Sequence, residues 1–159
     1  MTPEEIKSLI DMAHSGDVSA QIELAARYAT GDEIQQDYRK AVNWYKEAAK
    51  TNDPEATYNL GLMYLFGEGV KKDQARALTL LKSAAELGSH DANILLGDAY
   101  AEGNLGLQQC SILAATHYLA ACPIGASRSI RCLGKLLLDN RITATELGNI
   151  MSSDASWPA

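Results

Sequence analysis

Apolar residues in the middle of the chain recur at spacings of three and four, which predicts amphipathic helices rather than strands. In the stretch "EATYNLGLMYLFGEGV", the residues Ala56, Leu60 and Tyr64 share one face of such a helix. Gly67 follows directly, and a glycine at this place can take the positive φ that ends many helices. Asp73 then stands at a natural N-cap position before a second apolar-periodic stretch. The pattern therefore predicts two helices joined by a short loop.

The same pattern returns with a period of 36 residues. The recurring sets are Ala20, Ala56 and Ala92; Leu24, Leu60 and Leu96; Tyr28, Tyr64 and Tyr100; and Gly31, Gly67 and Gly103. One extra residue after Gly103 moves the register to 37, so that Gly106 corresponds to Gly69. Repeated helix pairs bury their apolar faces against their neighbours. We therefore predict an all-α solenoid of antiparallel helix pairs.

At this point the residues carry a family resemblance. The pattern A-x-x-x-L-G-x-x-Y-x-x-G-x-G-V-x-x-D at 56–73, followed by Ala84-Ala85, closely resembles Sel1-like repeats, which are related to the tetratricopeptide repeat. The earlier copy has Ala25 in place of the first glycine, and the later copy has Cys110 at the N-cap of its second helix. The resemblance implies a right-handed superhelical arrangement of the helix pairs.

We expect one repeat domain over residues 1–152. Its predicted parts are an N-terminal cap helix at 3–15, three repeats at 19–52, 55–88 and 91–125, and a partial fourth repeat with a C-terminal cap at 126–152. The stretch "TATE" at 143–146 is a capping box that predicts the start of the last short helix. Residues 153–159 are expected to form a flexible tail.

Composition narrows the function classes. The formal net charge of −6 over 159 residues argues against a nucleic-acid partner, because duplex binding needs a basic face. It argues equally against docking on an anionic membrane. The acidic N-terminal stretch does not resemble a secretory signal, and no apolar run is long enough to span a membrane. We therefore expect a cytoplasmic protein, or a periplasmic one if a leader has been removed.

The residues offer little catalytic chemistry. The three cysteines, Cys110, Cys122 and Cys132, form no C-x-x-C pair and are expected to be free thiols. No histidine has a second ligand at i+3 or i+4 that would indicate a metal pair. His117 stands where the earlier copies have Trp44 and Leu80, which predicts a half-buried packing position. We predict no catalytic residue, no metal ligand and no cofactor.

The resemblance implies that the first helix of each pair lines a concave surface. Carried over position by position, the predicted partner-binding residues are Glu55, Tyr58, Asn59, Leu62, Phe66, Asp91, Leu95, Asp98, Glu102, Arg128, Arg131 and Lys135. The acidic and basic members of this set either read a peptide of mixed charge or neutralise each other across a helix contact. Tyr58, Leu62 and Phe66 either anchor a partner or belong to the core.

We predict a non-enzymatic protein–protein interaction module, acting as an adaptor or scaffold for a protein or peptide segment. The resemblance leaves three alternatives. The first is an immunity protein that neutralises a cognate secreted bacterial toxin. The second is an enzyme, since a few proteins of this repeat type have hydrolase activity on β-lactams. The third is a homodimer formed through an exposed terminal helix.

Overall fold

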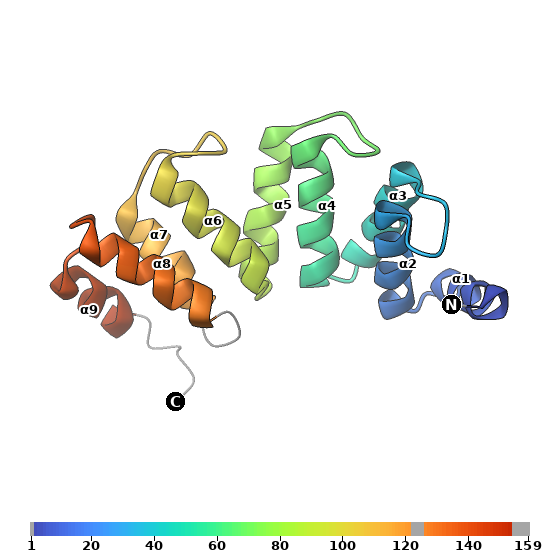
Figure 1. Ribbon diagram of the computed structural model, residues 1–159, viewed down its shortest axis with the longest axis horizontal. Coiled ribbons are helices and arrows are strands. Elements are labelled where there is room, and N and C mark those ends of the chain that lie inside the picture. Colours follow the sequence, from blue (N-terminus) through green and yellow to red (C-terminus); the bar gives the residue numbers. More distant parts are fainter. Residues whose placement is uncertain (1, 122–125, 154–159) are drawn as a thin grey trace. The chain divides into compact units, whose positions relative to one another are not determined.

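The computed structural model describes residues 2–121 and 126–153, with side chains at 2–121 and 130–152. All regular structure in these residues is helical (Figure 1). The helices are α1 (Pro3–His14), α2 (Val18–Thr30), α3 (Tyr38–Ala49), α4 (Pro54–Phe66), α5 (Gln74–Glu86), α6 (His90–Glu102), α7 (Ser111–Ala120), α8 (Ala126–Leu138) and α9 (Ala144–Ser153). The predicted all-α architecture of helix pairs is confirmed.

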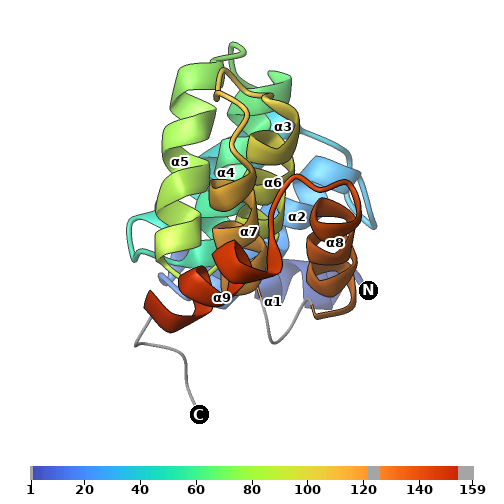
Figure 2. The ribbon, with the colours of Figure 1, turned by 90° about the vertical axis from the view of Figure 1, so that its left-hand side faces the viewer.

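Contacts divide the chain into two compact units, Met1–Leu87 and Gly88–Ala159. In unit 1, each of the helices α1 to α4 packs on the next one along the chain. In unit 2, α6 packs on α7, and α7 also contacts α8 and α9, which Figure 2 shows beside it. Contact between successive elements is the packing that a repeat architecture requires. The single domain over 1–152 stays a prediction.

Glycines inside the first helices allow close helix packing. A Cβ atom added to Gly61 of α4 would lie 3.2 Å from the side chain of Leu81 on α5. At Gly97 of α6, it would lie 2.5 Å from the ring of Tyr118 on α7. A glycine in a helix interior costs about 1 kcal/mol of propensity relative to alanine. The two close contacts explain why the sequence accepts that cost.

The helix ends follow the expected capping chemistry with one exception. Gly67 ends α4 with φ +79°. Asp37 and Asp73 begin α3 and α5, and each carboxylate accepts hydrogen bonds from backbone N–H groups of the first turn. Cys110 holds the equivalent extended conformation before α7, but its side chain makes no capping hydrogen bond. The third repeat therefore lacks a stabilising contact that the first two have.

A further 36-residue series marks the joints between repeats. Gly16, Asn52 and Gly88 each follow a second helix, and their φ angles are +95°, +60° and +92°. A left-handed residue at this point turns the chain towards the next first helix. These three positions are spaced 36 residues apart, like the other repeated positions.

The capping box at 143–146 is confirmed. The Thr143 hydroxyl accepts from the Glu146 backbone N–H at 3.1 Å, and the Glu146 carboxylate accepts from the Thr143 N–H at 2.7 Å. Ile150 of the helix that follows is buried in the core of unit 2. Of the predicted tail, 153–159, only Ser153 lies within the described residues, where it ends α9. Cys122 and its predicted free thiol also lie outside them, whereas Cys110 and Cys132 are free.

Candidate functional site

The face of α4 that points away from the core carries five of the predicted residues. We call Glu55, Tyr58, Asn59, Leu62 and Phe66 the α4 surface. Glu55 is exposed, and Tyr58, Asn59 and Leu62 are half-buried. Phe66 is 63% exposed at the C-terminal end of the helix. The alternative that Phe66 belongs to the core is therefore wrong, because Leu60, Met63 and Tyr64 already fill the core side of α4.

The predicted residues of α6 have different environments. Asp91 and Glu102 are exposed, whereas Leu95 and Asp98 are half-buried. The Asp98 carboxylate accepts a hydrogen bond of 2.8 Å from the Tyr118 hydroxyl. Burial, followed by this hydrogen bond, raises the pKa of Tyr118 far above its usual range. Asp98 thus has a structural role in holding α6 to α7, in addition to its predicted role in binding.

The predicted basic residues lie on α8. Arg131 and Lys135 are exposed, and neither forms an ion pair with a described residue. Arg128 lies on the same helix, but its side chain is outside the described set. Two apolar residues of α8 are also exposed, Ile130 at 62% and Leu138 at 84%. Their spacing of eight puts them close to one helix face.

His117 occupies the packing position that the repeat predicts. It is half-buried, its ring stacks on Tyr100 with centroids 5.5 Å apart, and its Nδ1 lies 2.9 Å from the Asn93 side-chain oxygen. Across the described residues, no three His, Cys, Asp or Glu side chains are grouped as a metal site would require. The same part of the chain contains no helix of the length and apolarity needed to cross a membrane.

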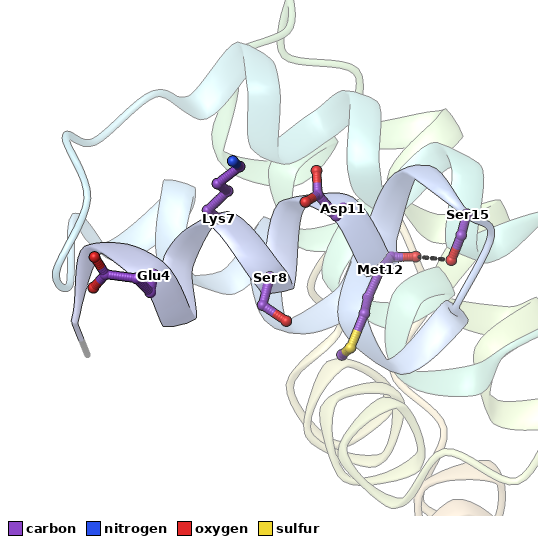
Figure 3. Close-up of a pocket in the computed structure, with 6 residues that line it drawn as sticks. All are labelled: Glu4, Lys7, Ser8, Asp11, Met12 and Ser15. Carbon is purple, nitrogen blue, oxygen red and sulfur yellow. Dashed lines mark hydrogen bonds between the residues drawn. The ribbon is translucent and has the colours of Figure 1, made fainter.

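Two surface hollows lie in unit 1. One has a volume of about 450 Å³ and is lined by residues of α1 and its C-cap only: Glu4, Lys7, Ser8, Asp11, Met12 and Ser15 (Figure 3). Figure 3 shows their side chains spread along the helix rather than converging on one point, so this hollow presents no candidate chemistry. The other, of about 320 Å³, lies at the α2–α3 connection and is lined by Tyr28, Ile34, Gln35, Gln36, Asp37 and Lys40.

Comparison with known families agrees with the helix pairs. The Sel1 repeat model matches residues 18–53, 54–89 and 90–122. The chain belongs to the Sel1 repeat family. Sel1 repeat proteins are generally protein-interaction modules and typically non-enzymatic scaffolds. The match does not extend over 126–152, so the partial fourth repeat stays a prediction.

Two solved structures are similar to this Sel1 repeat protein. One is a protective antigen present in uropathogenic Escherichia coli strains that displays an SLR fold, with a TM-score of 0.74 and 37% identity. The match covers 82% of this chain and 28% of that one, so this chain spans less than a third of that relative. The other is a Sel1 repeat protein from Oxalobacter formigenes, with a TM-score of 0.70 and 35% identity, covering 82% of this chain and 98% of that one. No curated protein matches the chain.

Proposed function

We propose that this Sel1 repeat protein is a non-enzymatic adaptor or scaffold that binds a protein or peptide segment through its first helices. The observation that carries the proposal is the α4 surface. Phe66 is 63% exposed, and Leu62 and Tyr58 precede it by one and two helical turns. Aromatic side chains are enriched at protein–protein interfaces, and the leucine between the two rings adds apolar contact area.

The magnitudes support Phe66 as the main anchor. Complete burial of a phenylalanine side chain contributes about 1.5–3 kcal/mol. Because Phe66 is already about one-third covered, a partner gains roughly 1–2 kcal/mol by covering the rest. A loss of 1.4 kcal/mol weakens binding about tenfold. Removal of this one ring is therefore measurable in a binding experiment.

Unit 2 carries charged residues that can contribute selectivity where a partner contacts that unit. Asp91, Glu102, Arg131 and Lys135 are all exposed, and exposed charges at an interface influence partner choice and association rate more than affinity. Asp98 is a weaker candidate, because a partner would compete with its hydrogen bond from Tyr118.

The test is affinity capture from a bacterial lysate with three versions of the protein. The first is the parent, and the second carries Tyr58→Ala, Leu62→Ala and Phe66→Ala. The third, a matched control, replaces three exposed residues of the second helix α5 by alanine: Thr79, Lys82 and Glu86. A protein captured by the parent and the control, but lost by the α4 variant, is then purified and titrated by calorimetry.

A partner whose affinity falls about tenfold or more with the α4 variant alone supports the proposal. Equal capture by all three versions, or equal loss in both variants, overturns it. The identity of the captured protein separates an adaptor from an immunity protein, because an immunity protein binds one toxin at nanomolar affinity or tighter. Light scattering of the parent at several concentrations tests the homodimer alternative.

A further inference from the structure

The structure assigns to unit 1 a second binding surface, a basic edge that accepts an acidic, Asp/Glu-rich peptide segment of a partner. The basic edge consists of Arg39, Lys40, Lys71, Lys72 and Arg76, all of which are exposed. These residues lie at the starts of α3 and α5 and in the α4–α5 loop. They do not belong to the α4 surface, so this inference goes beyond the proposed function.

A backbone contact brings the two halves of the basic edge together. The Cβ of any side chain at Gly69 would lie 2.3 Å from the Tyr38 carbonyl oxygen and 2.8 Å from the Arg39 nitrogen. The α4–α5 loop therefore rests on the start of α3, and Figure 1 shows it extending towards that helix. Lys71 follows Gly69 by two residues, a reach of about 7 Å along the chain. That is within the Debye length of about 8 Å at physiological ionic strength.

The cations of the basic edge are not neutralised by ion pairs. In the part of the chain that the structure describes, Arg39, Lys71, Lys72 and Arg76 form none, and Lys40 has only a contact of 3.9 Å with Asp37. The two stretches that carry the basic edge, 37–40 and 68–76, contain five cations and three acids (Asp37, Glu68 and Asp73), a formal excess of two positive charges (5 − 3). The whole chain has a net charge of −6. The basic edge is therefore a local reversal of the overall charge.

The N-cap carboxylates are already engaged with the backbone. Asp37 Oδ1 accepts from the backbone N–H groups of Arg39 and Lys40 at 3.0 and 3.1 Å. Asp73 Oδ1 accepts from the N–H of Arg76 at 2.9 Å. The basic side chains of these first turns consequently remain available to a ligand.

Two of the cations lie over aromatic rings. Lys40 Nζ lies 5.0 Å from the centroid of the Tyr28 ring, and the Arg76 guanidinium lies 4.6 Å from that of Tyr64. The two pairs are one repeat apart. A cation near the N-terminus of a helix is repelled by the positive end of the helix dipole. The attraction between the cation and the aromatic ring compensates for this repulsion, and the side chain keeps its positive charge. In the third repeat Leu113 stands at the equivalent position, so this pairing is a feature of unit 1.

The surroundings favour a short acidic peptide over a larger polyanion. The hollow of about 320 Å³ next to Lys40 has room for a peptide side chain and is lined partly by Gln35 and Gln36. Gln36 Nε2 already donates to the Ala29 carbonyl oxygen and the Tyr38 hydroxyl, so the exposed Gln35 supplies the amide for such a side chain. A nucleic-acid duplex or an anionic membrane would extend beyond the basic edge onto an acidic protein, where like charges repel it. A short segment meets only the local charge, because screening removes contributions from beyond about one Debye length.

The test uses a fluorescently labelled oligoglutamate peptide and the full chain, with binding measured by fluorescence anisotropy at low and at physiological salt. The edge variant is Lys71→Glu with Lys72→Glu. The matched control is Lys50→Glu with Lys82→Glu, which makes the same change in net charge at two exposed lysines of unit 1 outside the basic edge. Circular dichroism and urea unfolding check that both variants fold.

We expect the parent to bind oligoglutamate but not oligoglutamine, with affinity that falls as salt rises. The edge variant should bind about tenfold more weakly than the control. Equal losses in both variants would overturn the assignment, because they would show a general charge effect. Tighter binding of heparin or of anionic phospholipid vesicles than of oligoglutamate would overturn the choice of a peptide. The α4 variant keeps peptide binding, so failure of the proposed function and failure of this inference are distinguishable.

Discussion

Replacement of Gly69 by alanine tests whether the backbone of the α4–α5 loop packs directly on the backbone at the start of α3. Gly69 has φ +70°, and an added Cβ would lie 2.3 Å from the Tyr38 carbonyl oxygen. A left-handed conformation costs a non-glycine residue about 1–2 kcal/mol. Displacement of a packed backbone costs about 1–3 kcal/mol more. Gly69→Ala should therefore lower the free energy of unfolding of unit 1 by about 2–5 kcal/mol.

Gly16→Ala is the matched control for this measurement. Gly16 also has a positive φ, +95°, but nothing lies within 4 Å of a Cβ added there. Only the conformational cost of about 1–2 kcal/mol then applies. The difference between the two variants isolates the contact with α3.

Urea unfolding followed by the fluorescence of Trp44, a residue packed against the core of unit 1, measures both variants. A Trp157→Phe background leaves Trp44 as the sole tryptophan. If Gly69→Ala is no more destabilising than Gly16→Ala, the loop does not rest on α3 as described. The two halves of the basic edge would then not be held together by this contact.

Three further outcomes are expected. Gly97→Ala should destabilise the protein more than Gly61→Ala in calorimetry, because the Tyr118 ring can move aside less than the Leu81 side chain. An equal fall in melting temperature for the two variants would contradict this. Cys110→Asp should supply the missing N-cap of α7 and raise the free energy of unfolding by about 0.5–2 kcal/mol in urea titrations, whereas Cys110→Ala should not. Burial and a nearby carboxylate raise the pKa of Tyr45 to about 12, so its neutral form contributes stability that is complete below pH 10.0 and lost as the pH rises to about 12. Between these pH values, the free energy of unfolding measured with urea should fall less for Tyr45→Phe than for the parent protein. An identical fall in both would contradict the effect.

Local and periodic features of the fold could be predicted from the sequence. The helix pairs, the glycine end of α4 and the aspartate N-caps each depend on a few residues close together in the chain. Gly61 lies inside a predicted helix, and a Cβ added there would lie 3.2 Å from the Leu81 side chain. The repeat period then predicts the same features in the other copies, because a feature found in one copy recurs in the next.

Contacts between distant residues could not be predicted in the same way. The hydrogen bond from Tyr118 to Asp98 joins residues twenty positions apart on different helices. An acidic residue on an exposed face has the same pattern whether it binds a partner or a neighbouring helix. Ile130 illustrates the same difficulty, because helical spacing does not reveal which apolar face the fold leaves exposed. The pairing of Arg76 with Tyr64 recurs one period after that of Lys40 with Tyr28, but which ring each cation meets depends on how the loop between the helices folds back.

The left-handed residues Gly16, Asn52 and Gly88 allow the backbone of the repeat to be kept while its surface residues change. Each joint turns the chain through its backbone conformation, with little demand on the side chains that face outwards from the helices. Drift at those outward positions can alter what the surface recognises while the period stays constant. Asn52 is the joint at which a residue other than glycine must adopt a left-handed conformation. Duplicated copies of such a repeat can therefore diverge in their ligands without first having to rebuild their architecture.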